Sequence, residues 1–237
     1  MPDIVFEDNH LLVISKPANM LTQSDNTGDE SLHEWGKAYI KEKYQKPGEV
    51  YLGLVHRLDR PVGGLVAFAR TSKAASRLSE QLRSHHMERE YLAVVTGSSL
   101  PDSATLHDWL EKDETTGNVR VTNPHKAGAQ EAKLAYRVLA RDAQHDTALL
   151  HVRLQTGRKH QIRVQLAGSG HPIVHDMRYG QGVRGENIAL WGAVLRFDHP
   201  TRKVPLCFLS YPKASAFEPY APQIRAFLDQ QNITFHQ

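Results

Sequence analysis

Residues 132–154, AKLAYRVLARDAQHDTALLHVRL, indicate the fold class of this chain. Apolar and polar residues alternate over residues 132–138 and again over residues 148–154. Alternation of this kind is typical of strands with one buried face. The polar segment between them, Asp142–Asp146, fits the turn of a hairpin. We therefore expect two antiparallel strands here.

More strands and helices are expected on both sides of this hairpin. Ser31 and Glu34 have the spacing of a capping box at the start of one helix, and Thr71 or Ser72 caps a second helix. Strands outnumber helices, which predicts an α+β fold on a mixed, largely antiparallel sheet flanked by helices. The other strands are expected at residues 4–6, 11–14, 51–55, 65–69, 91–95, 190–197 and 206–209, and two further helices at residues 159–167 and 222–231.

Composition bounds the kind of protein. With 237 residues, 40% of them hydrophobic and 23% charged, the chain has the make-up of a globular protein with a core of its own. No linker-like stretch divides it, so a single domain over residues 1–237 is expected. Cys207 is the only cysteine, which excludes a disulfide framework and a multi-cysteine zinc site. Neither a secretory signal nor a membrane span is indicated, and a cytoplasmic protein is expected.

The net charge of +3 is too small to indicate a nucleic-acid partner, but its distribution is uneven. No acidic residue lies between Asp146 and Asp176. Four cationic residues do lie there, and they are Arg153, Arg158, Lys159 and Arg163. Such a stretch is either a solvated basic face or a functional surface.

The loop HRLDRPVGG, residues 56–64, places a carboxylate between two arginines. Asp59 stands between Arg57 and Arg60, in a segment rich in Pro and Gly that precedes a buried strand. Opposite charges nearby favour an ionised carboxylate, which can act as a nucleophile. The alternative is an aspartate that caps a turn or makes a structural ion pair.

Two further segments combine basic and aromatic residues. In QTGRKHQIR, residues 155–163, Gly157 suits a sharp turn into a helix, and helix starts attract phosphates. Arg163 could pair with a carboxylate through both of its parallel N–H groups, although the segment could also be a basic helix end on the surface. In Arg89-Glu90-Tyr91, the tyrosine is either a core residue or one that stacks on a base or relays a proton.

Taken in order, these segments resemble the RluA-type pseudouridine synthases. The similarity runs from about Ile4 to Pro212, which leaves residues 213–237 as a C-terminal extension. It is carried by His-Arg-Leu-Asp at 56–59, Arg-x-Tyr at 89–91, Thr-Gly-Arg-x-His-Gln-Ile-Arg at 156–163, Gly-His-Pro-Ile at 170–173 and Asp-x-x-Tyr-Gly at 176–180. The opening hairpin with Lys16-Pro17 is also similar. Three positions depart from the usual family residues, namely Gly63, Gln165 and His175. A separate S4-like RNA-binding module is not expected, because the residues before the Asp59 loop are interpreted as part of the catalytic domain.

The resemblance implies an enzyme that isomerises a specific uridine of tRNA or rRNA to pseudouridine, in a central catalytic cleft, after flipping the nucleotide out. It implies that Asp59 is the catalytic carboxylate, that Arg163 pairs with Asp59, and that Tyr91 stacks on uracil and serves as the base. Attack on the sugar or base and formation of a glycal both remain open. The implied RNA contacts are Arg57, Arg60, Arg89, Arg158, Lys159, His160 and Gln161. The resemblance implies no cofactor, no metal ion and a monomer.

Two other functions stay open on the sequence. A hydrolase such as a nucleosidase or glycosidase usually needs a second carboxylate, for which Glu90 and Asp176 are the nearest candidates. An RNA-binding protein without catalysis is the other, and the joint retention of Asp59, Tyr91 and Arg163 speaks against it.

Overall fold

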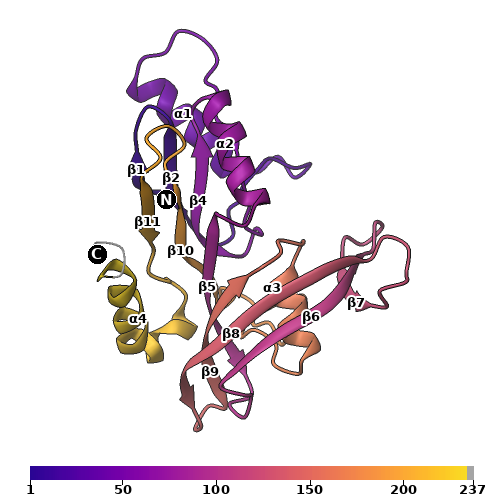
Figure 1. The fold of residues 1–237 in the computed structure, drawn as a ribbon. Coiled ribbons are helices and arrows are strands. Elements are labelled where there is room, and N and C mark those ends of the chain that lie inside the picture. The colour runs from indigo at the N-terminus through magenta and orange to yellow at the C-terminus, as the bar shows by residue number, and fades with distance from the viewer. Residues whose placement is uncertain (234–237) are drawn as a thin grey trace. The chain divides into compact units, whose positions relative to one another are not determined.

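In the computed structural model, which describes residues 1–233, the chain divides into two compact units. The first unit comprises Met1–Arg89 and Gly192–Tyr211, and the second comprises Glu90–Trp191 and the chain from Pro212 onward. Both units contain strands and helices, which confirms the α+β fold expected from the sequence (Figure 1). The organisation as a single domain stays a prediction.

The first unit is built on a sheet whose strands follow the order β1-β2-β4-β10, with β3 beside β4 and β11 beside β10. Every pair in it with an assigned register is antiparallel. Its strands are β1 (Asp3–Glu7), β2 (Leu11–Lys16), β3 (Gly53–Leu54), β4 (Gly63–Ala69), β10 (Leu190–Asp198) and β11 (Pro205–Leu209), and its helices are α1 (Leu32–Lys43) and α2 (Ser72–Arg83).

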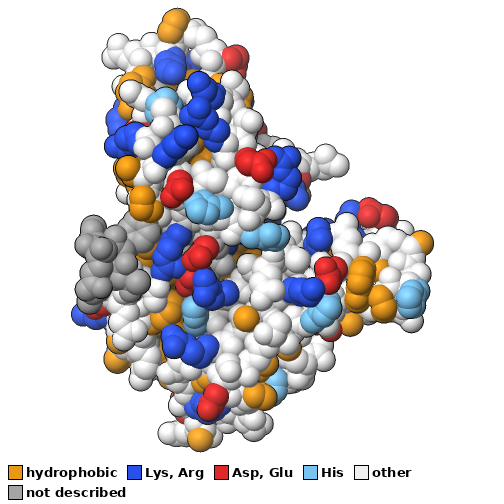
Figure 2. Space-filling model, in the orientation of Figure 1, with side chains coloured by type: hydrophobic (Ala, Val, Ile, Leu, Met, Phe, Trp, Pro, Cys, Tyr) orange, Lys and Arg blue, Asp and Glu red, His pale blue; other side chains and the backbone are white. Residues whose placement is uncertain are grey.

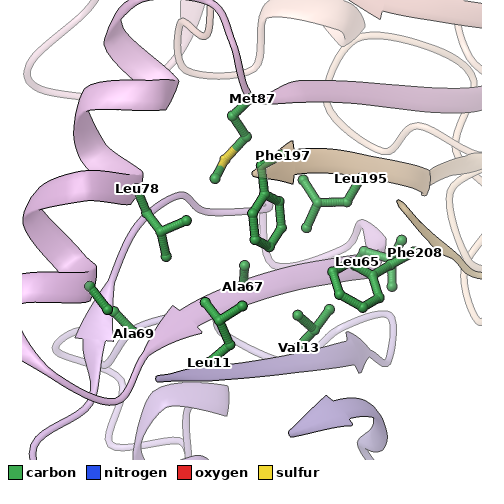
Figure 3. Packing of buried hydrophobic residues seen from close by; sticks show 11 residues of the cluster. Leu11, Val13, Leu65, Ala67, Ala69, Leu78, Met87, Leu195, Phe197 and Phe208 are labelled. Atoms are coloured by element: carbon green, nitrogen blue, oxygen red, sulfur yellow. The ribbon is translucent and has the colours of Figure 1, made fainter. Parts of the chain in front are cut away.

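Two helices cover opposite faces of this sheet. Successive residues of β2 point to opposite faces, so this strand packs against both helices. Leu11 and Val13 face α2 and belong to a buried cluster with Leu78 of that helix (Figure 3). On the other side, Gly36 of α1 lies against the side chains of Leu12 and Ile14. The missing side chain at Gly36 lets the helix approach the sheet closely.

Turn and cap residues act as the sequence predicts. The Ser31 hydroxyl accepts the Glu34 N–H, and the Glu34 carboxylate accepts the Ser31 N–H, so the capping box is confirmed. Thr71, rather than Ser72, caps α2. Gly64 has a φ of +123°, and a Cβ there would lie 2.4 Å from the backbone N and O of Gly192. Only glycine fits this close approach of β4 to β10.

The second unit has an antiparallel sheet in the order β5-β9-β8-β6-β7. The hairpin expected over residues 132–154 is confirmed as β8 and β9, whose turn is held by Asp142 Oδ1 accepting the N–H groups of Gln144 and His145. Strands β6 and β7 were not predicted. The elements of this unit are β5 (Glu88–Thr96), β6 (Ser103–Lys112), β7 (Val119–Thr122), β8 (Gln130–Asp142), β9 (Thr147–Leu154), α3 (Gln161–Gly168), the 3₁₀ helix η1 (Ser215–Tyr220) and α4 (Ala221–Ile233).

Within residues 1–233, no helix combines the length and the hydrophobicity that a membrane crossing requires.

Candidate functional site

The Asp59 loop, residues 56–62, leads into β4 in the first unit. Leu58 and Val62 are buried, whereas Arg57 and Arg60 are exposed and Asp59 is partly buried. The Val62 N–H donates to the Asp59 carbonyl at 3.0 Å and closes a tight turn. The apolar residues thus anchor the loop, while the charged residues between them stay near its surface.

The backbone of this loop is held by two buried polar side chains. The Thr22 hydroxyl donates to the Leu58 carbonyl at 2.7 Å and accepts the Leu58 N–H at 3.2 Å. Lys16 is fully buried, and its Nζ donates to the carbonyls of Met20 at 2.6 Å and Arg60 at 3.1 Å. Side-chain hydrogen bonds to its backbone therefore hold the loop in place.

Lys16 also lies within electrostatic range of Asp59. Burial lowers the pKa of Lys16 to about 7, the negative charge of Asp59 acts in the opposite direction, and Arg60 adds to the lowering. A third hydrogen bond joins Lys16 Nζ to the Pro17 carbonyl at 3.0 Å. No role was predicted for Lys16, although a lysine at the end of a strongly apolar strand is the sequence signal of a buried cation.

His56 supports the loop in its neutral form. Its Nε2 accepts the Ala67 N–H of β4 at 3.2 Å. Burial and, to a smaller extent, the positive charge of Arg89 lower the pKa of His56 to about 3. A neutral imidazole is also what this geometry requires, because a protonated Nε2 could not accept a hydrogen bond.

The loop from Thr156 to His160 in the second unit is held by Gln161. The Gln161 Oε1 accepts the Thr156 hydroxyl at 2.8 Å and the Arg158 N–H at 2.9 Å. Its Nε2 donates to the Lys133 carbonyl at 3.0 Å, and the side chain is buried. The predicted contact of Gln161 with RNA therefore gains no support from its position.

Helix α3 begins one residue after His160, which takes a left-handed conformation with a φ of 53°. The cationic residues of the acid-free stretch differ in exposure on the two sides of this position. Arg158 and Lys159 are exposed in the loop, whereas Arg163 lies inside and is 4% exposed. Earlier in the stretch, Arg153 is exposed with its Nε 3.6 Å from Glu90. The stretch is thus not one continuous basic face.

Arg163 is held by a buried carboxylate. Its Nε donates to Asp176 Oδ2 at 2.8 Å, and its Nη2 donates to Asp176 Oδ1 at 2.7 Å. The Arg163 guanidinium also lies 5.1 Å from the centre of the Tyr179 ring. Asp176 and Tyr179 belong to the motif at residues 176–180, but their place beside Arg163 was not predicted from the sequence.

Tyr91 and Glu90 lie on opposite sides of β5. Tyr91 is buried, and its register partner is Val152 of β9. Glu90 Oε2 lies 2.7 Å from Nε2 of His151, so this carboxylate is engaged in a buried polar pair. Both carboxylates that could serve as the second acid of a hydrolase, Glu90 and Asp176, are thus engaged with basic side chains.

The remaining predicted RNA contacts differ in their surroundings. Arg60 forms an ion pair with Asp29 at 2.5 Å, and Arg158 Nε donates to the Glu131 carbonyl at 2.9 Å. Arg89 is partly buried, and its Nε makes no hydrogen bond with any residue among 1–233. On the face of the second unit in Figure 2, basic side chains are interspersed with acidic and histidine side chains. Residues 1–233 contain no group of three or more His, Cys, Asp or Glu residues placed to hold a metal ion.

Comparison with known proteins identifies the family. The family model described as RNA pseudouridylate synthase matches residues 10–168. The chain is 36% identical over 181 residues to the RNA pseudouridine synthase YhcT of Bacillus subtilis, covering 76% of this chain and 58% of that protein. It is 34% identical to ribosomal large subunit pseudouridine synthase D of Xylella fastidiosa (86% and 64% covered) and 30% identical to tRNA pseudouridine synthase C of Vibrio cholerae (87% and 89% covered). The chain thus spans less than two thirds of the length of the first two relatives.

Solved structures agree on the fold. The human RNA pseudouridylate synthase domain containing 4 superposes with a TM-score of 0.75 at 20% identity, over 94% of this chain and 92% of that chain. The human RNA pseudouridylate synthase domain containing 1 gives a TM-score of 0.70 at 20% identity, over 95% of both chains.

Proposed function

Because the chain belongs to the RNA pseudouridylate synthase family, we propose that it isomerises a uridine of tRNA or rRNA to pseudouridine. The observation that carries the proposal is the family match over residues 10–168, which includes Asp59, Tyr91 and Arg163. Relatives named for large-subunit rRNA and for tRNA both match, which supports either RNA as the substrate. The cytoplasm, where both RNAs occur, is the proposed location.

The reaction breaks the bond between N1 of uracil and C1′ of ribose, turns the base and joins its C5 to C1′. The proton on C5 is removed, and N1, which is no longer bonded to C1′, takes up a proton. No atom is gained or lost overall, and the proposal needs no cofactor or metal ion. Asp59 is the proposed catalytic carboxylate, either as a nucleophile or as an aid to glycal formation. The partly buried position of Asp59 in a fixed turn supports this role, because a catalytic group must be both held and accessible.

Tyr91 and Arg163 complete the proposed catalytic set. Tyr91 would stack on the flipped uracil and remove the proton, and its place on a buried strand supports a fixed ring position. Arg163 would stabilise the charge of the catalytic carboxylate, and its rigid fork of N–H groups suits that role. We propose that the enzyme acts as a monomer.

A map of pseudouridine in all RNAs, from cells with and without the gene, tests this proposal. We expect at least one site in tRNA or rRNA to be lost without the gene. The purified chain should then convert the same uridine in a transcript of that RNA. No lost site together with no conversion would contradict the proposal, and release of free uracil would indicate a hydrolase instead.

The hydrolase alternative has little support in the structure. It needs a protonated carboxyl as acid beside a second carboxylate. Burial would raise the pKa of Asp176, but hydrogen bonds from Arg163 and its positive charge, with backbone N–H donors, leave that pKa below its usual value. Asp176 therefore stays ionised and is a poor proton donor.

Arg158 and Lys159 are two proposed RNA phosphate contacts that are exposed and adjacent in one loop. Replacing either residue by alanine should weaken RNA binding and reduce the salt dependence of binding, by a slope of roughly 0.7 to 0.9 for each lost phosphate contact. Binding titrations at several salt concentrations measure this slope. An unchanged slope in both variants would remove these residues from the interface, and Lys73→Ala on the exposed side of α2 is a matched control.

A further inference from the structure

The Arg163 guanidinium is fixed on one edge by Asp176. Arg163 and Asp176 are 4% and 1% exposed, and two parallel hydrogen bonds of 2.8 and 2.7 Å join them. A guanidinium offers two edges to carboxylates, one from Nε to Nη2 and one from Nη1 to Nη2. Asp176 takes the first, so any further carboxylate that Arg163 engages in the same bidentate way must use the second.

Tyr179 fixes the flat face of the same guanidinium. Its ring centre lies 5.1 Å from Arg163, within the range of a cation–π contact. The ring is itself held at its hydroxyl, which accepts the Val119 N–H at 3.0 Å and lies 2.7 Å from His160 Nδ1. Tyr179 is therefore a fixed wall for Arg163.

Asp176 is held as firmly as the residue it binds. Its Oδ1 accepts the N–H groups of Arg178 at 2.9 Å and Tyr179 at 3.2 Å, in addition to Arg163. Its own N–H donates to the Ile173 carbonyl at 3.1 Å, and its carbonyl accepts the Gly180 N–H at 3.0 Å. The turn over residues 173–180 thus holds the Asp176 carboxylate in place, and the carboxylate holds Arg163.

A buried ion pair is a poor means of stabilising a fold, because removing both charges from water offsets most of their attraction. Such a pair is better explained by what it orients. A group that acts in a reaction must be held within a fraction of an ångström, and supporting side chains with locked rotamers provide this. The Arg163 guanidinium has such support from Asp176 on one edge and from Tyr179 on its flat face.

We propose that Asp176 and Tyr179 are positioning residues of the pseudouridine synthase reaction, which aim Arg163 at the reacting groups. The inference rests on the proposed function and extends it to two residues outside the proposed catalytic set. Asp176 acts only through Arg163, and its negative charge serves to orient the guanidinium rather than to transfer a proton.

The first test replaces Asp176 by asparagine, which keeps the shape but loses the charge and one acceptor. With saturating RNA in single-turnover reactions, we expect pseudouridine formation to slow by about 10²-fold, with an RNA dissociation constant close to that of the parent chain. The matched control is Glu7→Gln, which makes the same change at a second buried pair with arginine, Arg70–Glu7 at 3.0 Å. Glu7→Gln should leave the rate of the folded protein unchanged. An Asp176→Asn rate equal to that of the control would overturn the inference.

A double-mutant cycle separates positioning from general damage to the fold. If Asp176 acts through Arg163, adding Asp176→Asn to Arg163→Ala should change the rate of the single Arg163→Ala variant by no more than about twofold. Rate losses that multiply in the double variant would contradict the proposal. Loss of folded protein alone would appear in both backgrounds and is measured by thermal unfolding.

Asp176→Glu keeps the charge and carries the test if Asp176→Asn does not fold. The longer side chain shifts the carboxylate by about one bond, which should again slow the reaction by about 10²-fold without abolishing RNA binding. A rate equal to that of the parent chain would overturn the proposal. If the parent chain itself forms no pseudouridine while it binds RNA, the proposed function fails first, and that outcome is distinct from an active parent with an equally active Asp176→Asn variant.

Discussion

The Asp59 loop and the start of α3 hold their charged residues in different ways. Around Asp59, Lys16 and Thr22 bind backbone groups of Arg60 and Leu58, so the loop as a whole is held. At α3, Asp176 binds the guanidinium of Arg163 itself, so one side chain is held. The difference suits the two residues, because a short aspartate side chain follows its backbone whereas a long arginine side chain must be fixed at its tip.

Removing the lysine that holds the Asp59 loop should have the largest effect on stability. Lys16→Met leaves the carbonyls of Pro17, Met20 and Arg60 without the donor that the buried Lys16 side chain provides. We expect the free energy of unfolding to fall by roughly 3 kcal/mol, because each acceptor that loses its partner is costly. Denaturant unfolding measures the change, with Lys73→Met on the exposed side of α2 as control. Equal stability of the two variants would show that Lys16 does not hold the loop.

Acid should lower the stability of the folded chain through His56, which supports the Asp59 loop. The folded chain keeps the pKa of His56 at about 3, whereas the unfolded chain has the ordinary value of about 6.5. Between these values the unfolded state binds a proton that the folded state does not, so stability falls as the pH falls. From pH 7 to pH 5 the loss from this residue is about 2 kcal/mol. His56→Gln should remove that part of the loss, and parallel pH profiles of the two proteins would count against a neutral buried His56.

A smaller effect is expected beside Asp176. His175 has a φ of 61°, in the left-handed region that favours glycine. His175→Gly should raise the free energy of unfolding by up to about 1 kcal/mol, because glycine adopts this conformation without the Cβ conflict. Thermal unfolding measures the gain, and His125→Gly, in an exposed turn without a positive φ, provides the matched control. A gain in both variants, or in neither, would mean that His175 is not strained.

The sequence predicted elements whose signals are local. The β8–β9 hairpin follows from strict alternation around a polar turn, and the α1 capping box from two residues at a fixed spacing. In β6 the apolar face formed by Ala104, Leu106 and Leu110 is interrupted by Asp108, and β7 has only four residues, so neither strand carries a long alternation. Residues 51–55 form a strand only at Gly53–Leu54. Helix α3 starts later than predicted because His160, not only Gly157, departs from helical geometry.

The candidate site shows the same limit. Asp59, Tyr91 and Arg163 could be named because each lies in a short motif. The residues that hold these three in place could not be predicted from motifs. Lys16 binds carbonyl groups, which every residue carries, and Asp176 meets Arg163 only through the turn over residues 173–180. The role of Gln165 could not be predicted either. Its Nε2 donates to Asp108 Oδ2 at 2.7 Å and so links α3 to β6, two elements far apart in the sequence.

Conversion of uridine by the Asp59→Asn variant tests the central claim most directly. The measurement is pseudouridine formed per chain in a substrate transcript, alongside the affinity for the same RNA, with Asp102→Asn as a control whose side chain is 90% exposed. We expect no detectable conversion by Asp59→Asn, RNA binding close to that of the parent chain, and full conversion by the control. Conversion by Asp59→Asn at a rate near that of the parent chain would contradict the assignment of Asp59 as the catalytic carboxylate.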